Sequence, residues 1–254
     1  MRRGFLFLIL CAALLVPSLA TAQQAEPPMY TFVAEWVVQR DQWDTFVQNW
    51  EKNTKPVFER MSANGTLVQW GAFSTIVHEE GATTHGVWFS ANSVAAIERV
   101  REELLKVPAQ PFMANAKHRD FFLRSLVHSG RTSAPASAYL WVSSQTVQPG
   151  KGADWRAHFD KYSKPVYDDL VKAGTISAYS VDVEQVHTDS SGLRFVVYIT
   201  PNADGVDKVT AAFQAINAKR SEEERRAIGQ ALGDLTVAGA HRDFFLRVLS
   251  FWNK

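Results

Sequence analysis

Apolar and polar residues follow two different periods along this chain, and the changes between them mark the predicted elements. Residues 29–39 are rich in Val, Thr and aromatic residues, which is typical of a strand. Residues 41–63 place their apolar residues at helical spacing, and Pro56 inside this segment predicts a kink or a second helical segment. Gly65 then predicts the end of the helix, because glycine adopts the left-handed cap conformation.

The next segments complete one structural unit. The pattern predicts strands over residues 66–78, 84–90 and 118–128, and a helix from Ser93, a favourable N-cap, to about Lys106. The resulting order is β-α-β-β-α-β, which is the ferredoxin-like arrangement.

The chain repeats this unit. Shifted by 109 positions, residues 30–78 align with residues 139–187 without a gap, and 12 of the 49 pairs are identical. The string His-Arg-Asp-Phe-Phe-Leu-Arg begins at His118 and again at His241, an offset of 123, so the second copy holds 14 extra residues. We place them around the charged helical stretch 218–234. The sequence therefore predicts two units, residues 29–129 and 138–254, joined by a Gly-, Ser- and Pro-rich linker at residues 130–137.

Both faces of the first predicted strand are mostly apolar. Tyr30 and Phe32 lie on one face, and Thr31 and Val33 lie on the other. A sheet of this kind needs cover on both faces, and the simplest second cover is the sister unit. The predicted fold class is α+β, with two tandem ferredoxin-like units packed sheet to sheet as an intramolecular α/β barrel.

This duplicated element order resembles the dimeric α/β-barrel superfamily in its fused two-copy form. That superfamily includes antibiotic-biosynthesis monooxygenases, haem proteins such as chlorite dismutases and dye-decolourising peroxidases, and stress-response barrel proteins. The resemblance covers nearly the whole predicted mature chain, but it rests on element order and not on a catalytic motif. It implies a pocket between the sheets and leaves the reaction open.

The N-terminal residues have the pattern of a secretory signal peptide. Residues 1–3 are basic at two positions, residues 5–16 are apolar, and Ala20-Thr21-Ala22 suits cleavage after Ala22. We therefore expect Sec-type export to the periplasm or the extracellular space. The only cysteine, Cys11, would leave with residues 1–22, so the mature chain would contain no disulfide.

Charge and hydropathy limit the kinds of partner that the mature chain could bind. It keeps 25 Lys and Arg residues against 26 Asp and Glu residues, a net charge near −1. This balance argues against nucleic-acid binding, and no later segment predicts a stable membrane anchor. A small-molecule ligand and a homo-oligomer stay open as partners.

The repeated fourth strand carries the first set of candidate polar residues. One face of this strand holds His118, Asp120 and Arg124 in the first copy and His241, Asp243 and Arg247 in the second copy. One interpretation is a cluster inside the barrel, in which the carboxylate orients the imidazole and the arginine binds an anionic group. The alternative is a structural role near the start of the strand.

Glu35 and four tryptophans are further candidates for the pocket. Glu35 lies in an otherwise apolar strand, so it is either a buried general base or a structural carboxylate paired with an arginine of the fourth strand. Trp36, Trp70, Trp88 and Trp141 lie on predicted strands and could line an apolar cavity or form the core.

Two histidines at strand ends are weak metal candidates. His78 is followed by Glu80, and His187 is followed by Asp189. Such pairs could bind a divalent ion, but a site needs three or four converging ligands, and hairpin ends are commonly polar.

The sequence predicts an exported protein that binds a small apolar or aromatic molecule in a pocket between two sheets. The first alternative is an enzyme of the same superfamily, either a cofactor-free monooxygenase or a haem enzyme. A haem enzyme would need His118 or His241 as the axial ligand, which requires that the strand turn the histidine into the barrel. The second alternative is a non-catalytic scaffold that assembles with itself. No cofactor is identified by any motif, and Glu35, His118 and His241 are the catalytic candidates.

Overall fold

The computed structural model describes residues 27–254, apart from residues 109, 115, 132–137 and 189–190. The signal peptide expected at residues 1–22 and most of the linker expected at residues 130–137 lie outside the described residues, so both stay predictions. In the described part of the chain, no helix is long and apolar enough to cross a membrane.

The first half has the predicted order of strands and helices. Its elements are β1 (Tyr30–Val37), α1 (Trp43–Asn49), α2 (Lys55–Ala63), β2 (Gln69–Thr75), β3 (His85–Ala91), α3 (Val94–Leu104) and β4 (Lys117–Gly130). A π-helical turn, Trp50–Thr54, separates α1 from α2, so the interruption predicted near Pro56 is confirmed. Ser93 is the N-cap of α3, because its side chain accepts a hydrogen bond from the Ala96 N–H.

The second half repeats this order and adds one helix. Its elements are β5 (Ala138–Thr146), α4 (Gly152–Tyr162), α5 (Lys164–Ala173), β6 (Ala178–Glu184), β7 (Leu193–Thr200), α6 (Ala203–Ala218), α7 (Glu222–Leu235) and β8 (Arg242–Asn253). Most of the charged stretch predicted to hold the extra residues forms α7. A capping box between Ser221 and Glu224 begins this helix.

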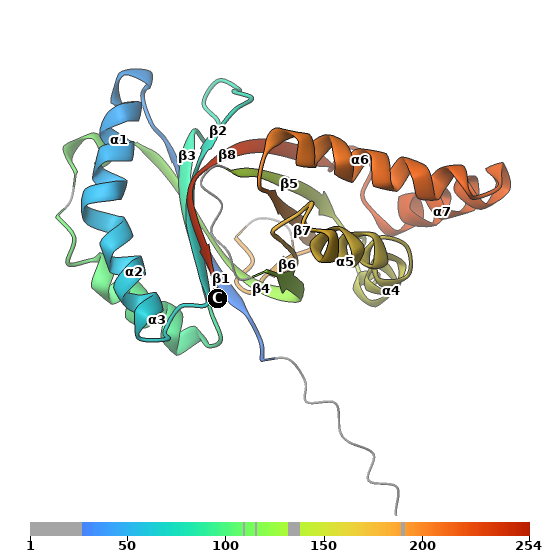
Figure 1. Cartoon of the computed structure of the whole chain (residues 1–254), viewed down its shortest axis with the longest axis horizontal. Helices are drawn as coiled ribbons and strands as arrows, with labels where there is room; N and C mark the ends of the chain where they lie inside the picture. Colours follow the sequence, from blue (N-terminus) through green and yellow to red (C-terminus); the bar gives the residue numbers. More distant parts are fainter. Residues whose placement is uncertain (1–26, 109, 115, 132–137, 189–190) are drawn as a thin grey trace, which may run out of the picture.

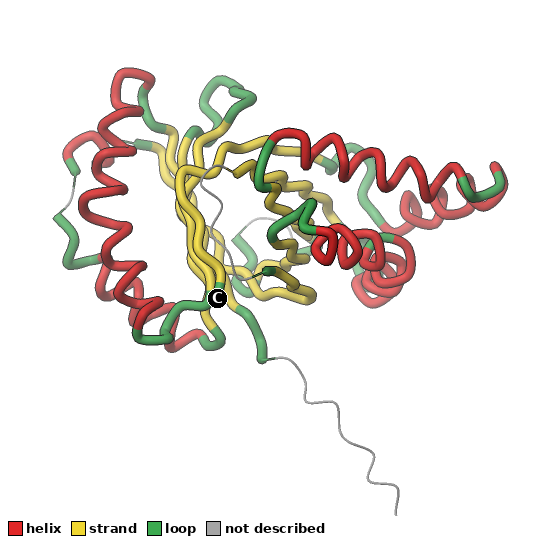
Figure 2. The backbone as a smooth tube through the Cα atoms, in the orientation of Figure 1, coloured by secondary structure: helices red, strands yellow, loops and turns green. Residues whose placement is uncertain are grey.

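The eight strands form one closed antiparallel barrel (Figures 1 and 2) in the order β1-β3-β2-β8-β5-β7-β6-β4. Each half contributes four neighbouring strands, and the halves join where β2 pairs with β8 and β4 pairs with β6. The two sheets therefore share hydrogen-bonded edges as well as facing each other across the interior. Helices α1–α3 cover one side of the barrel, and α4–α7 cover the other.

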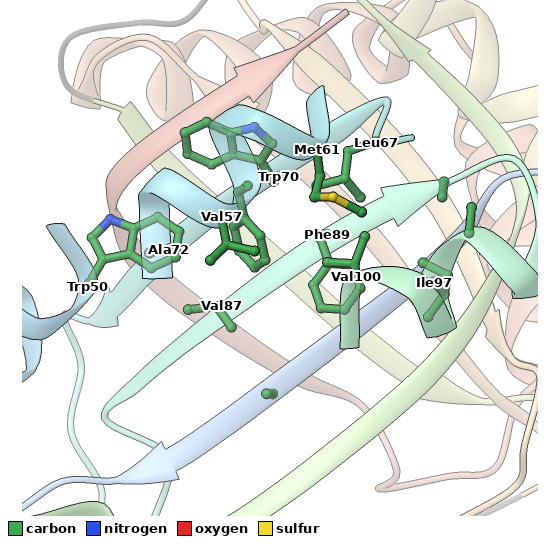
Figure 3. Close-up of a cluster of buried hydrophobic side chains, with 14 residues drawn as sticks. Trp50, Val57, Met61, Leu67, Trp70, Ala72, Val87, Phe89, Ile97 and Val100 are labelled. Atoms are coloured by element: carbon green, nitrogen blue, oxygen red, sulfur yellow. The ribbon is translucent and has the colours of Figure 1, made fainter. Parts of the chain in front are cut away.

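Three apolar layers stabilise this arrangement. The outer face of β1–β3 packs against α2, α3 and the π-helical turn, in a cluster that includes Trp50, Phe58 and Phe89 (Figure 3). A second outer cluster lies under the helices of the second half. The third layer fills part of the barrel interior, where Trp88 and Phe251 stack with ring centroids 6.1 Å apart.

Candidate functional site

The fourth strand of the first half directs His118 and Asp120 toward the helices. Phe121 and Leu123 are buried and line the barrel interior, whereas Phe122 packs against the outer core beneath the helices. Because neighbouring strand residues point to opposite faces, His118 and Asp120 share the outer face with Phe122. The prediction of a polar cluster inside the barrel is therefore wrong. The strand places its more apolar face, with Phe121 and Leu123, toward the interior.

The second copy of the motif has the same orientation. Leu246 and Val248 belong to the interior cluster, and Phe245 stacks against Tyr139 on the outer face with ring centroids 5.4 Å apart. His241 and Asp243, which alternate with the interior residues, therefore also lie on the outer side of the barrel wall.

A pocket of about 460 Å³ lies between this outer face and the helical layer of the first half. We call it the helix-side pocket. Its floor is formed by β1, β3 and β4, and its rim is formed by α1, the π-helical turn, α3 and the segment after α3. Aromatic walls are contributed by Phe32, Trp36, Phe46, Trp50 and Phe89. Its size is in the range of small-molecule sites, which span roughly 300–1,000 Å³.

His118, Asp120 and Trp36 meet in the helix-side pocket. His118 Nε2 lies 2.9 Å from Asp120 Oδ1, and the imidazole stacks on the Trp36 ring with centroids 5.0 Å apart. The side chains of His118 and Asp120 are 42% and 41% exposed, so both are accessible from the pocket. Three of the residues predicted from sequence are thus brought together, on the helix side of the sheet.

The two oxygens of Asp120 have different surroundings. Asp120 Oδ1 is buried against His118 Nε2, 2.9 Å away, so a bound ligand does not reach it. The side chain is 41% exposed, which leaves Oδ2 as the oxygen that a ligand can reach. Burial raises the pKa of the Asp120 carboxyl, while the charges of His118 and Arg101 oppose this rise. A carboxyl oxygen that faces the pocket can accept a hydrogen bond from a donor on a bound ligand.

The π-helical turn shapes one wall of the pocket. Pro56 has no N–H, so the chain before it cannot continue a regular α-helical hydrogen-bond ladder, and residues 50–54 form a wider turn instead. Asn49 and Thr54, at the two ends of this turn, contribute polar atoms to the pocket lining. Turns of this type are frequent at functional sites.

The matching pair in the second half has different partners. Asp243 Oδ1 lies 3.2 Å from His241 Nε2 and also accepts a hydrogen bond from Trp141 Nε1 at 3.3 Å. His241 Nε2 lies 3.0 Å from Ser143 Oγ. Trp141 stacks in parallel on Tyr198, with ring centroids 6.2 Å apart. Protein groups in the second half therefore make the contacts that the first half leaves open.

The two predicted anion-binding arginines lie away from these histidines. Arg124 is exposed and pairs with Tyr30 in the sheet register, seven residues from the start of β4. Arg247 donates a hydrogen bond to the Tyr139 hydroxyl at 3.3 Å. Neither arginine lines the helix-side pocket.

The remaining predicted tryptophans serve different layers. Trp70 belongs to the outer core of the first half, where its Nε1 donates to Ser62 Oγ at 2.7 Å. Trp88 lies inside the barrel, and its Nε1 donates to Gln69 Oε1 at 3.3 Å. Only Trp36 of the four predicted tryptophans lines the helix-side pocket.

Glu35 faces the mouth of the barrel and is paired. Its Oε2 accepts a hydrogen bond from Arg119 Nη2 at 2.9 Å and one from Thr83 Oγ1 at 3.0 Å. Arg119 belongs to β4, so the contact is the pairing with a fourth-strand arginine that the sequence offers as the structural interpretation of Glu35. This arrangement leaves Glu35 held at the mouth by two donors.

The metal candidates do not converge. His78 is exposed and stacks on Trp43 with ring centroids 5.0 Å apart, and Glu80 is exposed in the following loop. His187 is exposed, and Asp189 lies outside the described residues. Within the described ranges, no group of three or more His, Cys, Asp or Glu side chains could hold a metal ion.

Sequence reasoning missed several polar residues that face cavities. Asn49, Thr54 and Arg101 line the helix-side pocket, but ordinary helical spacing does not distinguish them from solvent-facing residues. Asp182 is buried inside the barrel. A signal for it exists in the segment Ser180-Val181-Asp182-Val183-Glu184, whose strict alternation gives one strand face only polar residues.

The comparisons with known proteins identify the fold. No protein-family model matches the sequence, and no curated protein matches it significantly. A solved structure of a proposed monooxygenase from Lactobacillus acidophilus NCFM is similar with a TM-score of 0.60 and 10% identity, covering 90% of this chain and 97% of that chain. An anthrone oxidase-like protein gives a TM-score of 0.56 and 10% identity, covering 90% and 94%. A proposed monooxygenase from Fusobacterium nucleatum gives 0.55 and 11%, covering 89% and 94%.

These likenesses and the closed eight-stranded barrel define the fold of this chain. The chain has the fold of the dimeric α/β-barrel superfamily, as the element order indicated. At 10–11% identity the likeness describes the fold alone.

The haem alternative can be tested against the histidines that it requires. An axial ligand needs an imidazole nitrogen free to bind iron. This alternative also requires a histidine that the strand turns into the barrel, whereas His118 and His241 both lie on the outer face of the barrel wall. Neither histidine therefore fits an axial ligand inside the barrel, and no step is assigned to a haem group.

Proposed function

We propose that this protein binds a small, flat apolar or aromatic molecule in the helix-side pocket, with His118 and Asp120 as its polar contacts. The observation that carries the proposal is the accessible pair of His118 and Asp120 in a pocket with aromatic walls. A ligand hydroxyl or N–H would donate a hydrogen bond to Asp120 Oδ2. The aromatic rings would remove the rest of the ligand from water.

Catalysis on the bound molecule is the second candidate function, and the contact between His118 and Asp120 favours it. Asp120 lies where it would stabilise a protonated imidazole, so His118 could accept a proton from an acidic O–H or C–H of the ligand. Loss of that proton would leave an electron-rich molecule able to react with dioxygen, which is the chemistry named for the structural neighbours described as monooxygenases.

We also infer that the two halves arose by duplication and that only the first half kept the ligand site. The repeat of 12 identities in 49 pairs supports the duplication. The hydrogen bond from Trp141 to Asp243 supports the loss, because it gives Asp243 a protein donor for which Asp120 has no counterpart. The basic and apolar pattern of residues 1–22 supports export, so the ligand would be met outside the cytoplasm.

The two halves provide matched variants for the test. 2-Hydroxyanthrone is a suitable probe, because it is flat and aromatic, carries a hydroxyl donor and belongs to the anthrone class named by one structural neighbour. We expect His118→Ala and Asp120→Asn to weaken 2-hydroxyanthrone binding roughly tenfold, the effect of one lost hydrogen bond of about 1.4 kcal/mol. His241→Ala and Asp243→Asn should leave binding unchanged. Isothermal titration calorimetry measures the affinity, and dioxygen uptake in the same samples tests for catalysis.

The pattern across the four variants decides the outcome. Equal affinity in all of them, or equal losses in both halves, would contradict a site at His118 and Asp120. Binding that depends on the first pair without dioxygen uptake would support binding and argue against oxygenation of this probe.

A further inference from the structure

A separate cavity of about 140 Å³ lies inside the barrel, between the two halves. Its walls are mostly apolar and include Phe73, Trp88, Leu140, Phe195 and Ile199. An apolar protein cavity of about 150 Å³ is known to hold benzene, so this volume suits a molecule with one aromatic ring. The helix-side pocket lies on the other side of the barrel wall, so the two sites are distinct.

Most polar groups on the cavity wall are already paired with each other. Thr31 Oγ1 and Ser90 Oγ are 2.8 Å apart. Trp88 Nε1 donates to Gln69 Oε1, and Gln69 Nε2 donates to Asn253 Oδ1, both at 3.3 Å. A bound water needs two to four polar partners, and these pairs leave few groups free to provide them.

Two carboxyl groups line this wall: Glu35, which is held by Arg119 and Thr83, and Asp182, which is 4% exposed. Ser125 Oγ donates to its Oδ1 at 2.5 Å, and Ser180 Oγ donates to its Oδ2 at 2.6 Å. Each carboxyl oxygen can accept more than one hydrogen bond, so both keep the capacity to accept another. Burial raises the pKa of Asp182, while the two serine hydroxyls and the charge of His128, which also lines the cavity, oppose this rise.

The interior is reached from the mouth of the barrel. A larger, open cavity of about 890 Å³ occupies the mouth, and it shares Glu35, Phe121 and Phe195 with the inner cavity. The rings of Phe121 and Phe195 meet edge to face, with centroids 5.5 Å apart, where the two cavities join. A flat molecule that displaces these rings would pass from solvent to Asp182.

We propose that the barrel interior is a second binding site, for a one-ring aromatic molecule that donates a single hydrogen bond to Asp182, as a phenol does. The ring fills the apolar part of the cavity, and the donor reaches the open acceptor positions of the carboxyl group. The site joins residues of both halves, because Phe73 and Trp88 come from the first and Asp182 and Leu140 from the second.

Fluorine NMR with para-fluorophenol and fluorobenzene tests this site in the full mature chain. Asp182→Leu removes the acceptor but keeps an apolar side chain, so it should weaken para-fluorophenol roughly tenfold and leave fluorobenzene within twofold. Ala178→Leu should abolish binding of both probes, because Ala178 lines the cavity and the added carbons would occupy it. Asp169→Asn, an exposed substitution on α5, is the matched control and should change neither affinity.

Three results would overturn the proposal. The first is absence of binding to the wild-type chain, which would leave the cavity to water. The second is equal binding of para-fluorophenol by the wild type, Asp182→Leu and Ala178→Leu. The third is a loss of affinity in His118→Ala that is absent in Asp182→Leu, because that result would place the probe in the helix-side pocket. Conversely, failure of 2-hydroxyanthrone binding in the helix-side pocket would leave this proposal unaffected.

Discussion

Asp120 and Asp243 occupy matching positions in the repeated motif, but their carboxylates have different partners. Trp141 donates a hydrogen bond to Asp243, whereas the residue at the matching position in the first half is Phe32, which has no polar hydrogen to donate. This difference on a neighbouring strand gives the Asp243 carboxylate a protein donor that the Asp120 carboxylate lacks. Strand alternation predicted that His118 and Asp120 share a face. It could not tell which face turns inward, because that depends on the packing of residues far away in the sequence.

His85 should make the fold sensitive to acid. Its ring is 2% exposed, packed between Trp43 and Phe46, and burial lowers its pKa from 6.5 to about 4, helped by the nearby His78. Between these values the unfolded chain takes up a proton that the folded chain does not, so stability falls as the pH drops from about 6.5 to 4. The loss from this group is on the order of 3 kcal/mol. We expect His85→Phe to remove it, as measured by urea unfolding at pH 7 and pH 4.5.

The comparison between variants isolates this residue from the other titrating groups. Asp182, whose pKa is raised by burial, has the opposite sign, because the folded chain holds its proton to higher pH and stability falls as the pH rises. His187→Phe is the matched control, since His187 is exposed. If His85→Phe and His187→Phe lose the same free energy of unfolding between the two pH values, the assignment to His85 is wrong.

Secondary-structure elements were largely predictable from local pattern, and their edge pairing was not. The strands, the kinked helix at Pro56 and the cap at Ser93 follow from periodicity and turn chemistry, which are local properties. The pairing of β2 with β8 joins residues almost 180 positions apart, and its register shifts between Ala72 and Phe73. Nothing within either strand specifies that partner. The helix-side pocket could not be predicted from local pattern either, because it depends on how the π-helical turn and α3 pack over the sheet.

Gly71 is the residue on β2 that permits this edge pairing. A Cβ at Gly71 would overlap the Trp88 ring and come within 2.7 Å of the Ser250 carbonyl oxygen of β8. Ser250 cannot move away cheaply, because it pairs with Ala72 in the sheet and its Oγ accepts a hydrogen bond from Trp50 Nε1. We expect Gly71→Ala to lower the free energy of unfolding by about 3 kcal/mol, typical of overpacking. Chemical denaturation with a linear extrapolation measures this change.

A second glycine supplies the opposite expectation for the same substitution. Gly229 lies in α7, and a Cβ there would meet no atom within 4 Å. Gly229→Ala should therefore stabilise the protein by up to about 1 kcal/mol, because alanine loses less backbone entropy in a helix. If Gly71→Ala changes the free energy of unfolding by no more than Gly229→Ala does, the close packing of Trp88 on β2 is not required.

At the scale of the whole molecule, the barrel makes each half dependent on the other. The interior cluster combines Phe73 and Trp88 from the first half with Leu140 and Leu246 from the second half. Separation would expose these residues and leave the edges of β2 and β4 without partners. A wholly packed interface between the sheets would favour the scaffold alternative, whereas the interior contains a cavity lined by Asp182.

This dependence can be tested by dividing the mature chain between Arg131 and Ala138. We expect each fragment alone to self-associate or aggregate, and the two fragments expressed together to form a 1:1 complex, as measured by light scattering and native mass spectrometry.

The 1:1 complex should be preferred because the position that holds Phe73 in the first half holds Asp182 in the second half. A mixed pair therefore encloses one residue of each kind. A pair of second halves would enclose two Asp182 carboxyl groups in one apolar interior, and burying two like charges close together is costly. A pair of first halves would instead place two Phe73 rings where the intact barrel has one. A fragment that stays monomeric and unfolds cooperatively would contradict this interdependence.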